Sequence, residues 1–523
     1  MECSCVRQTD LPNTSKLFAD LIYHFDRVSD LYPFAPNDAD ALTEATKFDF
    51  PDDRRADVVA ALTPLNIGNP SLERLARRGT YAVVTGQQVG LFSGPAYTIF
   101  KALTAIRIAE ELTARGVSTV PIFWLATEDH DFAEVNHAYV FNADQQPVRI
   151  EAIAQADAEP VGGVAVKEFP IAELRAALAG LPFADEAVAL VERAYIPGAT
   201  MGAAFADLIR ELFAPYGLLL IDPMTQALRD IAAPLMREAV ERMPELVDAL
   251  QVRSKELVNR GYHAQVLVDQ QTSLAFLLED GKRLVLRRTA DEFTTGKRKI
   301  SRDELAAMAD HLSPNALLRP VMQDYMLPTV AYVGGPAELA YLAQSRVLYE
   351  KLLGRQPVAF PRAGFTILDE RSNKRMAKYR LAPTDLFQLE SAFRASIAAR
   401  LVPESLRESM GAAAKTANRA IEDLATELMR FDPSLAKALE TSQRKINHQL
   451  GKIQRKTASQ ILKRDAQADR EATMLHGLTF PEKHLQERLY SFVPFYAKFG
   501  PALIRELHSA IKLECPDHQF LVV

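Results

Sequence analysis

Residues 81–131 constrain the fold of this 523-residue chain more than any other stretch. The apolar run 81–85 is typical of a buried parallel strand. A loop with regularly spaced glycines follows, and we expect Pro95 at the first position of a helix, because proline is preorganised there. Apolar residues then recur at helical spacing until Gly116, and a second apolar run, 120–126, completes a strand–helix–strand unit. The pattern predicts an α/β fold built on a Rossmann-like parallel sheet.

The second predicted strand ends in a cluster of ionisable residues, Glu128, Asp129, His130 and Asp131. A right-handed crossover would place this cluster beside the glycine-containing loop, at the carboxyl ends of neighbouring strands. Open α/β sheets bind ligands at that edge, so we expect the chemistry here. Asp129 or Asp131 could hold a substrate ammonium and His130 could transfer a proton, whereas the structural alternative is a helix-capping carboxylate beside an oriented histidine.

A later junction repeats the features of the first. The apolar run 329–333 leads into Gly334 and Gly335, followed by Pro-Ala at a predicted helix start and by Glu338. Helix N-termini can hold a phosphate or carboxylate, although a Gly-Pro pair can also simply make a sharp turn. The first loop matches neither G-x-G-x-x-G nor the P-loop, which disfavours dinucleotide and kinase chemistry. Its polar side chains could still reach a nucleotide or substrate: Gln87, Gln88, Ser93, Tyr97, Thr98 and Lys101.

The remaining patterns predict a core over residues 1–382 with insertions at about 142–200 and 270–315. Residues 1–80 are expected to be mostly helical, with a frayed end that carries Cys3 and Cys5. The insertions should contain a strand-like segment at 161–169 and a hairpin that turns at Asp280-Gly281. One long helix is expected at 225–260, a strand at 264–268, a short capped helix from Ser301 and a polar connection at 313–328.

Beyond residue 382 the composition changes. Apolar residues step by three and four along 406–428, and a second helical pattern follows a turn near Pro433. We predict an antiparallel coiled-coil hairpin over residues 383–475. The final segment, 476–523, mixes proline with aromatic residues and should pack back on the core.

Charge and composition limit the function. A net charge of −6 argues against nucleic-acid binding and a membrane-surface role, and no apolar run reaches 18 residues. The chain has only three cysteines and no recognisable signal peptide, so we expect a cytoplasmic protein. Two alternatives to a metal-free enzyme remain. His130, Glu134 and His137 would form a metal-dependent hydrolase site if their segment were helical, and the coiled coil could serve a non-catalytic scaffold.

Five motifs resemble those of the BshC family, the cysteine-adding ligases of bacillithiol biosynthesis. They are TGQQVGLFSGPAYTIFK at 85–101, FWLATEDHDFAEVNH at 123–137, Gly261-Tyr262-His263, LRPVMQDYMLPTVAYVGGPAELAY at 318–341 and LQERLYSFVPFY at 485–496. The resemblance runs along almost the whole chain. It implies a Rossmann core similar to class I aminoacyl-tRNA synthetases, interrupted by two connective insertions, and a coiled coil through which the protein forms a homodimer.

The resemblance also implies a reaction in which cysteine is joined to the glucosamine amine of glucosaminyl malate. Mg²⁺-bound ATP would activate the carboxylate as an adenylate, and no tightly bound metal is expected. The synthetases' HIGH motif is absent; residues 93–98 occupy its place without histidines. The resemblance implies three groups of site residues. The floor of the site, for the nucleotide or acyl group, would consist of Gly86, Gln87, Gln88, Gly94, Tyr97 and Thr98. The cysteine ammonium or the attacking amine would bind at Glu128, Asp129, His130 and Asp131, and the opposite wall would consist of Asp324, Tyr325, Gly334, Gly335 and Glu338, with Arg319 for the malate carboxylates.

Overall fold

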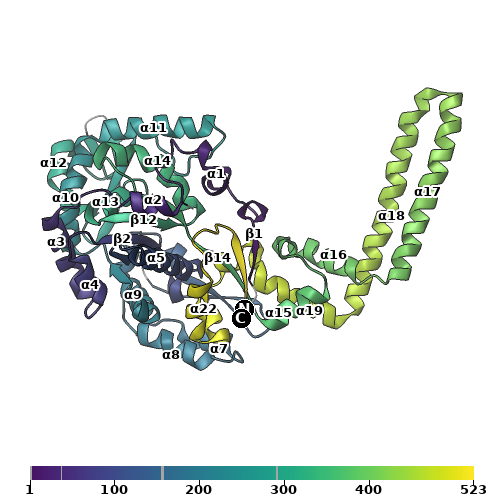
Figure 1. Cartoon of the computed structure of the whole chain (residues 1–523), viewed down its shortest axis with the longest axis horizontal. Helices are drawn as coiled ribbons and strands as arrows, with labels where there is room; N and C mark the ends of the chain where they lie inside the picture. Colours follow the sequence, from purple (N-terminus) through teal and green to yellow (C-terminus); the bar gives the residue numbers. More distant parts are fainter. Residues whose placement is uncertain (1–2, 37, 155–157, 290–291) are drawn as a thin grey trace.

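Five parallel strands form the central sheet of the computed structural model, which describes residues 3–36, 38–154, 158–289 and 292–523 (Figure 1). The strands are β2 (Tyr81–Gln88), β3 (Thr119–Ala126), β6 (Leu219–Ile221), β12 (Thr329–Gly334) and β13 (Val358–Pro361). Their order is β13-β12-β2-β3-β6, and every neighbouring pair is parallel. The chain runs from β2 through β3 to β6 and then returns to the other side of β2. The predicted Rossmann-like sheet is confirmed, with its topological switch point between β2 and β12.

Helices cover both faces of this sheet because successive strand residues point to opposite sides. Phe123 and Leu125 of β3 pack with α5 (Tyr97–Ala114) and α9 (Met201–Phe213). Ile122 and Trp124 belong instead to the cluster that contains α10 (Gln226–Glu241), α11 (Met243–Asn259) and α14 (Pro336–Leu352). The continuous apolar run of β3 therefore fills two separate hydrophobic layers.

The prediction that Pro95 occupies the first position of a helix is wrong. The strand β2 continues through Gly86 to Gln88, and α5 begins only at Tyr97. The reason is a contact from the far end of the chain: Pro95 forms a β-bridge with Ser491, and the Ala96 backbone N–H donates to the Tyr490 carbonyl at 2.7 Å. Gly116 follows the α5 C-cap with φ of +86°, as predicted.

A second sheet has the order β10-β9-β8-β7-β11. The predicted hairpin is confirmed: β7 (Thr272–Glu279) and β8 (Lys282–Thr289) are joined at Asp280 and Gly281, whose φ values of +50° and +73° suit a type I′ turn. The capped helix after Ser301 is also present. The predicted polar connection at 313–328 instead contains most of the strand β11 (Leu312–Pro314) and the helix α13 (Arg319–Met326). The elements before it are β9 (Glu292–Thr294), β10 (Lys299–Ser301) and α12 (Arg302–Ala307).

The two ends of the chain meet in a third sheet, which corrects the expectation of a frayed N-terminus. β1 (Cys3–Val6) pairs antiparallel with β15 (His518–Val522), and β15 pairs parallel with β14 (Gly364–Leu368). The helices α1 (Lys16–Tyr23), α2 (Ala39–Glu44), α3 (Asp52–Leu62) and α4 (Pro70–Leu75) make the rest of the first 80 residues largely helical. The last segment adds α20 (Gln486–Leu489), α21 (Val493–Phe499) and α22 (Ala502–Ala510).

Three further predictions fail locally. Residues 161–169 contain a 3₁₀ helix, Val161–Gly163, and one isolated bridge rather than a strand, and 264–268 is a loop. The expected single helix at 225–260 is broken at Arg242, because Pro244 lies in the first turn of α11 and cannot continue the hydrogen bonding of α10. The segment between β3 and α9 holds α6 (Phe132–Val135), β4 (His137–Phe141), β5 (Pro147–Glu151), α7 (Ile171–Leu178) and α8 (Ala184–Ala194).

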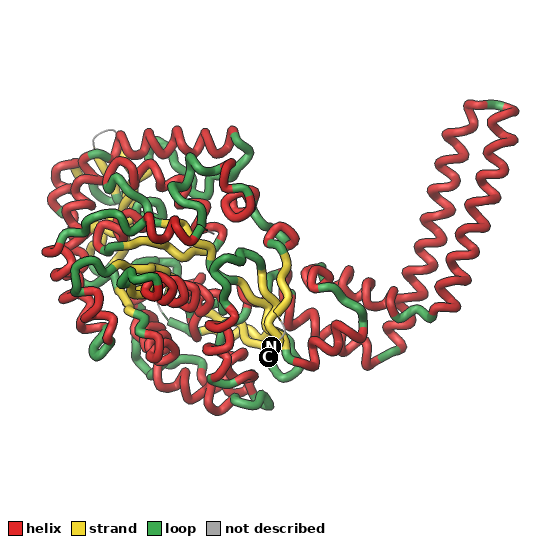
Figure 2. The backbone as a smooth tube through the Cα atoms, in the orientation of Figure 1, coloured by secondary structure: helices red, strands yellow, loops and turns green. Residues whose placement is uncertain are grey.

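A helical hairpin projects from the body of the molecule (Figures 1 and 2). Its long helices, α17 (Glu404–Phe431) and α18 (Ala436–Arg464), lie side by side and run in opposite directions around a short turn. The shorter helices α15 (Glu370–Lys378), α16 (Glu390–Arg400) and α19 (Ala466–Thr479) connect it to the core. No residue of α17 is buried. No helix in the described part of the chain combines the length and apolarity needed to cross a membrane.

Candidate active site

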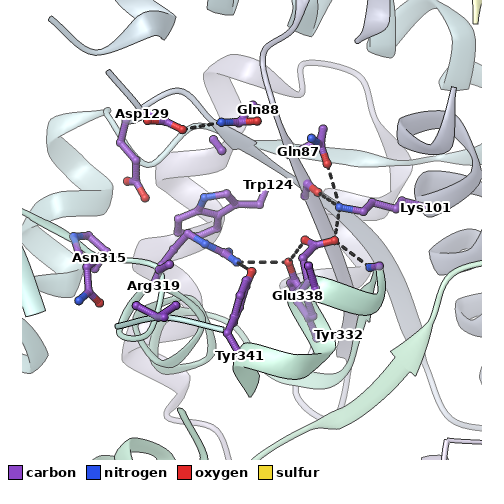
Figure 3. Close-up of a pocket in the computed structure, with 18 of the residues that line it drawn as sticks. Gln87, Gln88, Lys101, Trp124, Asp129, Asn315, Arg319, Tyr332, Glu338 and Tyr341 are labelled. Carbon is purple, nitrogen blue, oxygen red and sulfur yellow. Dashed lines mark hydrogen bonds and ion pairs between the residues drawn. The ribbon is translucent and has the colours of Figure 1, made fainter. Parts of the chain in front are cut away.

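A cavity of about 680 Å³ opens at the carboxyl ends of β2, β3 and β12 (Figure 3). Gly86, Gln87 and Gln88 line it from β2, while the start of α14 and the β7–β8 hairpin contribute its walls. In Figure 3, Trp124 lies at the centre of the lining residues, with Gln88 and Asp129 on one side and Lys101 and Glu338 on another. The cavity therefore sits at the switch point of the sheet, where such folds bind ligands.

A buried ion pair joins the first and second strand–helix junctions. The Lys101 ammonium, from α5, pairs with the Glu338 carboxylate at the start of α14. Lys101 also donates to the Gly86 carbonyl at 3.0 Å and to Gln87 Oε1 at 2.8 Å. Burial alone would raise the pKa of Glu338, but Lys101 and the Gly335 N–H, which donates to Glu338 at 2.8 Å, lower it. Glu338 is therefore ionised, and both charges are satisfied within the protein.

Arg319 is held by two tyrosines at the edge of the same network. Its guanidinium donates to the Tyr341 hydroxyl at 2.8 Å and to the Tyr332 hydroxyl at 3.2 Å, and Tyr332 in turn donates to Glu338 at 2.8 Å. Phenolic oxygens accept these bonds without neutralising the guanidinium. Arg319 thus presents a fixed positive charge to the cavity, which it lines.

Glu128 is the buried carboxylic acid of the cavity. Only 5% of the residue is exposed, and its Oε1 has no hydrogen-bond partner among the described residues. Burial raises the pKa of Glu128 to about 7; Asp222 and Asp129 add to the rise, and Arg283 and Arg319 oppose it. The carboxyl group can accordingly accept or release a proton near neutral pH, as a general acid or base requires.

Arg283 is a second cation beside Glu128, and sequence reasoning missed it. It lies on β8, 7% exposed, with its guanidinium 3.8 Å from the centre of the Phe276 ring. It donates to Ser313 Oγ at 3.1 Å and to the Pro314 carbonyl at 2.9 Å, and it lies 3.3 Å from His130 Nδ1. The sequence placed Arg283 in a predicted hairpin, but it gave no sign that this hairpin packs over the edge of the central sheet.

The acidic cluster after β3 divides into separate roles. Asp129 accepts from Gln88 Nε2 at 2.6 Å and from the His130 backbone N–H at 2.7 Å, and both Asp129 and His130 line the cavity. Gln88 also donates to Glu134 at 2.9 Å. Asp131 does not line the cavity; it caps α6 by accepting from the Glu134 N–H at 3.3 Å. The capping alternative therefore describes Asp131, whereas Asp129 and His130 face the ligand space.

The proposed metal group of His130, Glu134 and His137 is not assembled. Only residues 132–135 are helical, and His137 begins β4 with its Nδ1 3.2 Å from the Ala133 carbonyl. No cluster of three or more histidine, cysteine or carboxylate side chains with metal-binding geometry occurs among the described residues. The geometry gives the hydrolase alternative no site.

Several predicted residues lie outside the cavity lining. Ser93 and Thr98 are buried behind it; the Ser93 hydroxyl accepts from the Phe492 N–H at 3.2 Å. Gly94, with φ of +62°, packs against Gly90, where a Cβ would lie 2.9 Å from the Gly94 Cα. These residues shape the loop rather than the floor of the cavity. Gly334 lines an adjoining cavity instead.

Asp324 and Tyr325 also point elsewhere. Asp324 is 1% exposed and accepts hydrogen bonds from Tyr349 and from Gln323, the latter at 3.0 Å. Tyr325 stacks under Arg54, whose guanidinium lies 3.6 Å from the ring centre. By contrast, the cavity is lined by eleven of the predicted residues: Gly86, Gln87, Gln88, Tyr97, Lys101, Glu128, Asp129, His130, Arg319, Gly335 and Glu338.

Besides Arg283, the sequence patterns did not indicate Trp124, Asn315, Arg362 or Arg488, which also line the cavity. Trp124 is fully buried, and its indole Nε1 has no partner in the described part of the chain. Buried polar atoms are normally hydrogen-bonded, so an unpaired atom on a side chain that lines a cavity is a candidate partner for a ligand. Trp124 Nε1 and Glu128 Oε1 are two such atoms.

A doubly wound parallel sheet with a polar cavity at its switch point defines a Rossmann-like α/β protein with a small-molecule site. The sequence matches the family description "Bacillithiol biosynthesis BshC, N-terminal Rossmann-like domain" over residues 1–363, and "Bacillithiol biosynthesis BshC, C-terminal coiled-coil domain" over residues 365–523. The chain belongs to the BshC family, which confirms the resemblance drawn from the motifs.

Relatives of full length support this assignment. A protein of Solibacter usitatus (strain Ellin6076) is 52% identical over 524 residues, covering 100% of both chains. A protein of Koribacter versatilis (strain Ellin345) is 37% identical with 99% of each chain covered, and one of Symbiobacterium thermophilum is 32% identical with 88% of each covered. All three carry the name "Putative cysteine ligase BshC".

Proposed function

We propose that this protein is an ATP-dependent ligase that joins the carboxyl group of cysteine to the glucosamine amine of glucosaminyl malate. The family assignment supports the ligase class, and the raised pKa of Glu128 is the observation that best supports the proposed mechanism. The sugar amine is protonated as an ammonium at neutral pH and becomes a nucleophile only after it loses that proton, and a base that works at neutral pH needs a pKa near 7. Glu128 lines the cavity, has a pKa of about 7 and has an Oε1 atom without a hydrogen-bond partner among the described residues.

The residues of the cavity fit a nucleotide. Its volume of about 680 Å³ is in the range of small-molecule sites, and Trp124 Nε1 offers an unpaired donor. Arg319 would hold phosphate oxygens, because guanidinium groups bind oxyanions in paired geometry. ATP, with Mg²⁺, would supply the activation that turns a cysteine carboxyl oxygen into a leaving group.

Asp129 and Glu128 would then divide the work on the two amines. Asp129 faces the cavity and receives its protein hydrogen bonds from Gln88, His130 and Asp131, so its charge can hold the cysteine ammonium. The sugar amine attacks the cysteine carbonyl carbon; a C–N bond forms, the bond to the activating phosphate oxygen breaks, and the amine proton passes to Glu128. Arg283 and Arg319 stabilise the negative charge that develops on the carbonyl oxygen.

We also propose that the protein works as a homodimer joined through the hairpin. Leu424 on α17 is 51% exposed, and Ile446 and Ile453 on α18 are 40% and 57% exposed. Packing of α17 against α18 does not bury these apolar side chains, and exposed apolar surfaces often mark association sites. A second hairpin offers the same residues in return, as a symmetric interface requires.

The test is to incubate the purified full-length protein with cysteine, glucosaminyl malate and ATP and to follow products by mass spectrometry. Bacillithiol together with AMP and pyrophosphate supports the ligase with activation as an adenylate. Bacillithiol with ADP keeps the ligase and replaces the adenylate by an acyl phosphate. If no product forms and cells lacking the gene keep normal bacillithiol, the proposed function is wrong.

A further inference from the structure

A second cavity, of about 390 Å³, adjoins the first. The two share four lining residues: Pro336, Ala337, Arg362 and Arg488. Most of the rest of the second cavity's lining comes from the segment between β1 and α1, including Gln8, Thr14 and Ser15, and from residues 480–488 near the C-terminus; Phe18, Gln265, Gly334 and Gly364 complete it. The pairing of β1 with β15, at opposite ends of the chain, brings these two segments together.

The boundary between the cavities carries an excess of positive charge. Three cations surround the Tyr97 ring: Lys101, Arg362 and Arg488 lie 5.6, 5.1 and 5.9 Å from its centre. Lys101 is neutralised by Glu338, and Arg362 by Glu487 at 2.5 Å. Arg488 has no carboxylate partner within the described ranges of the chain. It is the one cation of the three whose charge the protein leaves available.

Lys483 adds to this excess. It lines the second cavity and, like Arg488, forms no ion pair with any described residue. Lys483 and the preceding Glu482 both have positive φ values, +64° and +50°, which side-chain-bearing residues rarely adopt. The turn is anchored by Gln486, which donates to the Leu478 carbonyl at 3.1 Å and the Ile367 carbonyl at 3.0 Å. The fold thus holds a lysine in an unfavourable backbone conformation at the cavity wall.

Acidic groups do not balance these charges. Glu487 is the single carboxylate among the residues that line the second cavity, and its two oxygens are occupied by Arg362 and by the Phe365 backbone N–H at 2.9 Å. Lys483, Arg488 and the neighbouring His484 therefore face a space whose remaining lining is neutral. Because Lys483 and Arg488 are exposed cations without a carboxylate partner among the described residues, the cavity favours a ligand that itself carries negative charge.

We propose that the second cavity binds the anionic end of a substrate whose reacting end lies in the first cavity, with Arg488 as the bridging anion anchor. The ligand chemistry is a pair of oxyanions close together, as in a dicarboxylate or a polyphosphate. This inference rests on the proposed function, which supplies one source of each: the malate carboxylates of the sugar substrate and the phosphates of ATP. In this proposal Arg488 and Lys483 bind the anion, whereas the family resemblance implied that Arg319 binds the malate carboxylates.

The experiment is isothermal titration of the full-length protein with L-malate and, separately, with pyrophosphate. Arg488→Ala should weaken binding of the anchored anion about 10- to 100-fold, because a charged hydrogen-bond partner is lost. Lys483→Ala should weaken it less, and Arg488→Lys should restore part of it. Arg505→Ala, an exposed arginine on α22 that lines neither cavity, is the matched control and should bind as wild type. Unfolding curves verify that each variant is folded, which the exposure of Arg488 favours.

The two probes distinguish the sources: Arg488-dependent binding of malate assigns the cavity to the sugar substrate, and Arg488-dependent binding of pyrophosphate assigns it to the nucleotide. Wild-type protein that binds neither, or an Arg488→Ala variant that binds both within twofold of wild type, overturns the inference even if the protein makes bacillithiol. Arg488-dependent binding without bacillithiol formation by any variant leaves the inference standing and removes the proposed reaction alone.

Discussion

Burial at position 128 keeps a carboxylic acid partly protonated near neutral pH, just beyond the end of β3. Glu128 and Asp129 are adjacent in sequence, yet only Glu128 is almost fully buried. Asp129 receives hydrogen bonds from Gln88 and His130, whereas one oxygen of Glu128 receives none from the described residues. Two neighbouring carboxyl groups thus have different surroundings, which is the basis for the different roles proposed for them above.

The first prediction concerns the pH dependence of the ligase reaction. If Glu128 is the base, kcat/KM should rise with pH through about 7 as its carboxyl group ionises. Glu128→Gln should lower kcat by roughly 10²- to 10⁴-fold and abolish this limb of the profile. Asp222→Asn is the informative control, because Asp222 raises the pKa of Glu128; the variant should keep activity and move the limb to lower pH. A limb that persists in Glu128→Gln would contradict the assignment.

The second prediction concerns stability, and its sign follows from the same pKa. The folded pKa of Glu128 is raised from 4.5 to about 7, so the folded state binds more protons than the unfolded state between these values. Stability therefore falls as pH rises through that window, by up to about 3 kcal/mol. Glu128→Gln cannot titrate, so the free energy of unfolding of the variant minus that of wild type should increase by about 3 kcal/mol from pH 4 to pH 8. Urea unfolding of both proteins at both pH values measures this difference, and a difference that is the same at the two pH values would refute the argument.

At the scale of elements, the spacing between β2 and β3 depends on a missing side chain. A Cβ at Gly86 would lie 2.8 Å from the Trp124 carbonyl oxygen and 2.9 Å from the Trp124 Cβ. The nearest atoms belong to the paired strand and cannot rotate away. The missing side chain at Gly86 therefore lets Trp124 pack closely against β2, at the level where both residues line the cavity.

The third prediction is that Gly86→Ala destabilises the protein by about 1–3 kcal/mol, since the strands must separate to accept the methyl group. Gly163→Ala is the matched control: no atom lies within 4 Å of its added Cβ, and its φ is not positive, so its stability should stay within about 0.5 kcal/mol of wild type. Denaturant unfolding measures both. Equal stabilities of the two variants would show that the sheet adapts freely at Gly86.

Local patterns predicted the elements that local forces determine. The apolar run 120–126 became β3, and Asp280-Gly281 became a hairpin turn, because burial and backbone conformation are set by neighbouring residues there. The start of α5 was misplaced because Tyr490 and Ser491, almost 400 residues away, bind the backbone at Pro95 and Ala96. The pairing of β1 with β15 was missed for the same reason, since strands of four and five residues carry too little pattern to reveal a partner so distant.

The candidate site shows the same division. Residues on the sheet edge, such as Gln88, Asp129 and Glu338, could be predicted because parallel strands must end together. Arg283 and Arg488 could not, because the hairpin β7–β8 and the C-terminal segment reach the edge through tertiary packing alone. Glu128 was among the candidates, but its raised pKa depends on burial that involves those distant elements.

At the scale of the whole molecule, the body and the arm are stabilised in different ways. Two large hydrophobic clusters fill the body, whereas α17 has no buried residue and α18 has only Ala458 and Leu462, near the end where α18 leads into α19. Asn418 and Asn447 exchange hydrogen bonds of 3.0 Å across the hairpin, which fixes its register at a cost in apolar packing. The arm thus contributes little apolar packing of its own, which is the basis for the proposal that a second copy covers it.

The fourth prediction is that two substitutions on this surface, Leu424→Glu and Ile453→Glu together, convert a dimer into a monomer. Both side chains are more than half exposed in the single chain, so the charges should not unfold the hairpin, but they would be buried and unpaired between two copies. The dimer Kd should rise by roughly 100-fold or more. Analytical ultracentrifugation measures it, and helical content by circular dichroism verifies that the arm is intact.

The matched control places the same charges on exposed polar positions of the same helices, Thr426→Glu and Gln454→Glu. If association follows the apolar side chains, this control stays dimeric, because its added charges remain in water. If both double variants dissociate, net charge on the arm rather than burial controls assembly. If wild-type protein is monomeric at micromolar concentration, the exposed leucine and isoleucine need another partner. The arm would then join this enzyme to a different protein, since its apolar side chains would still lack cover.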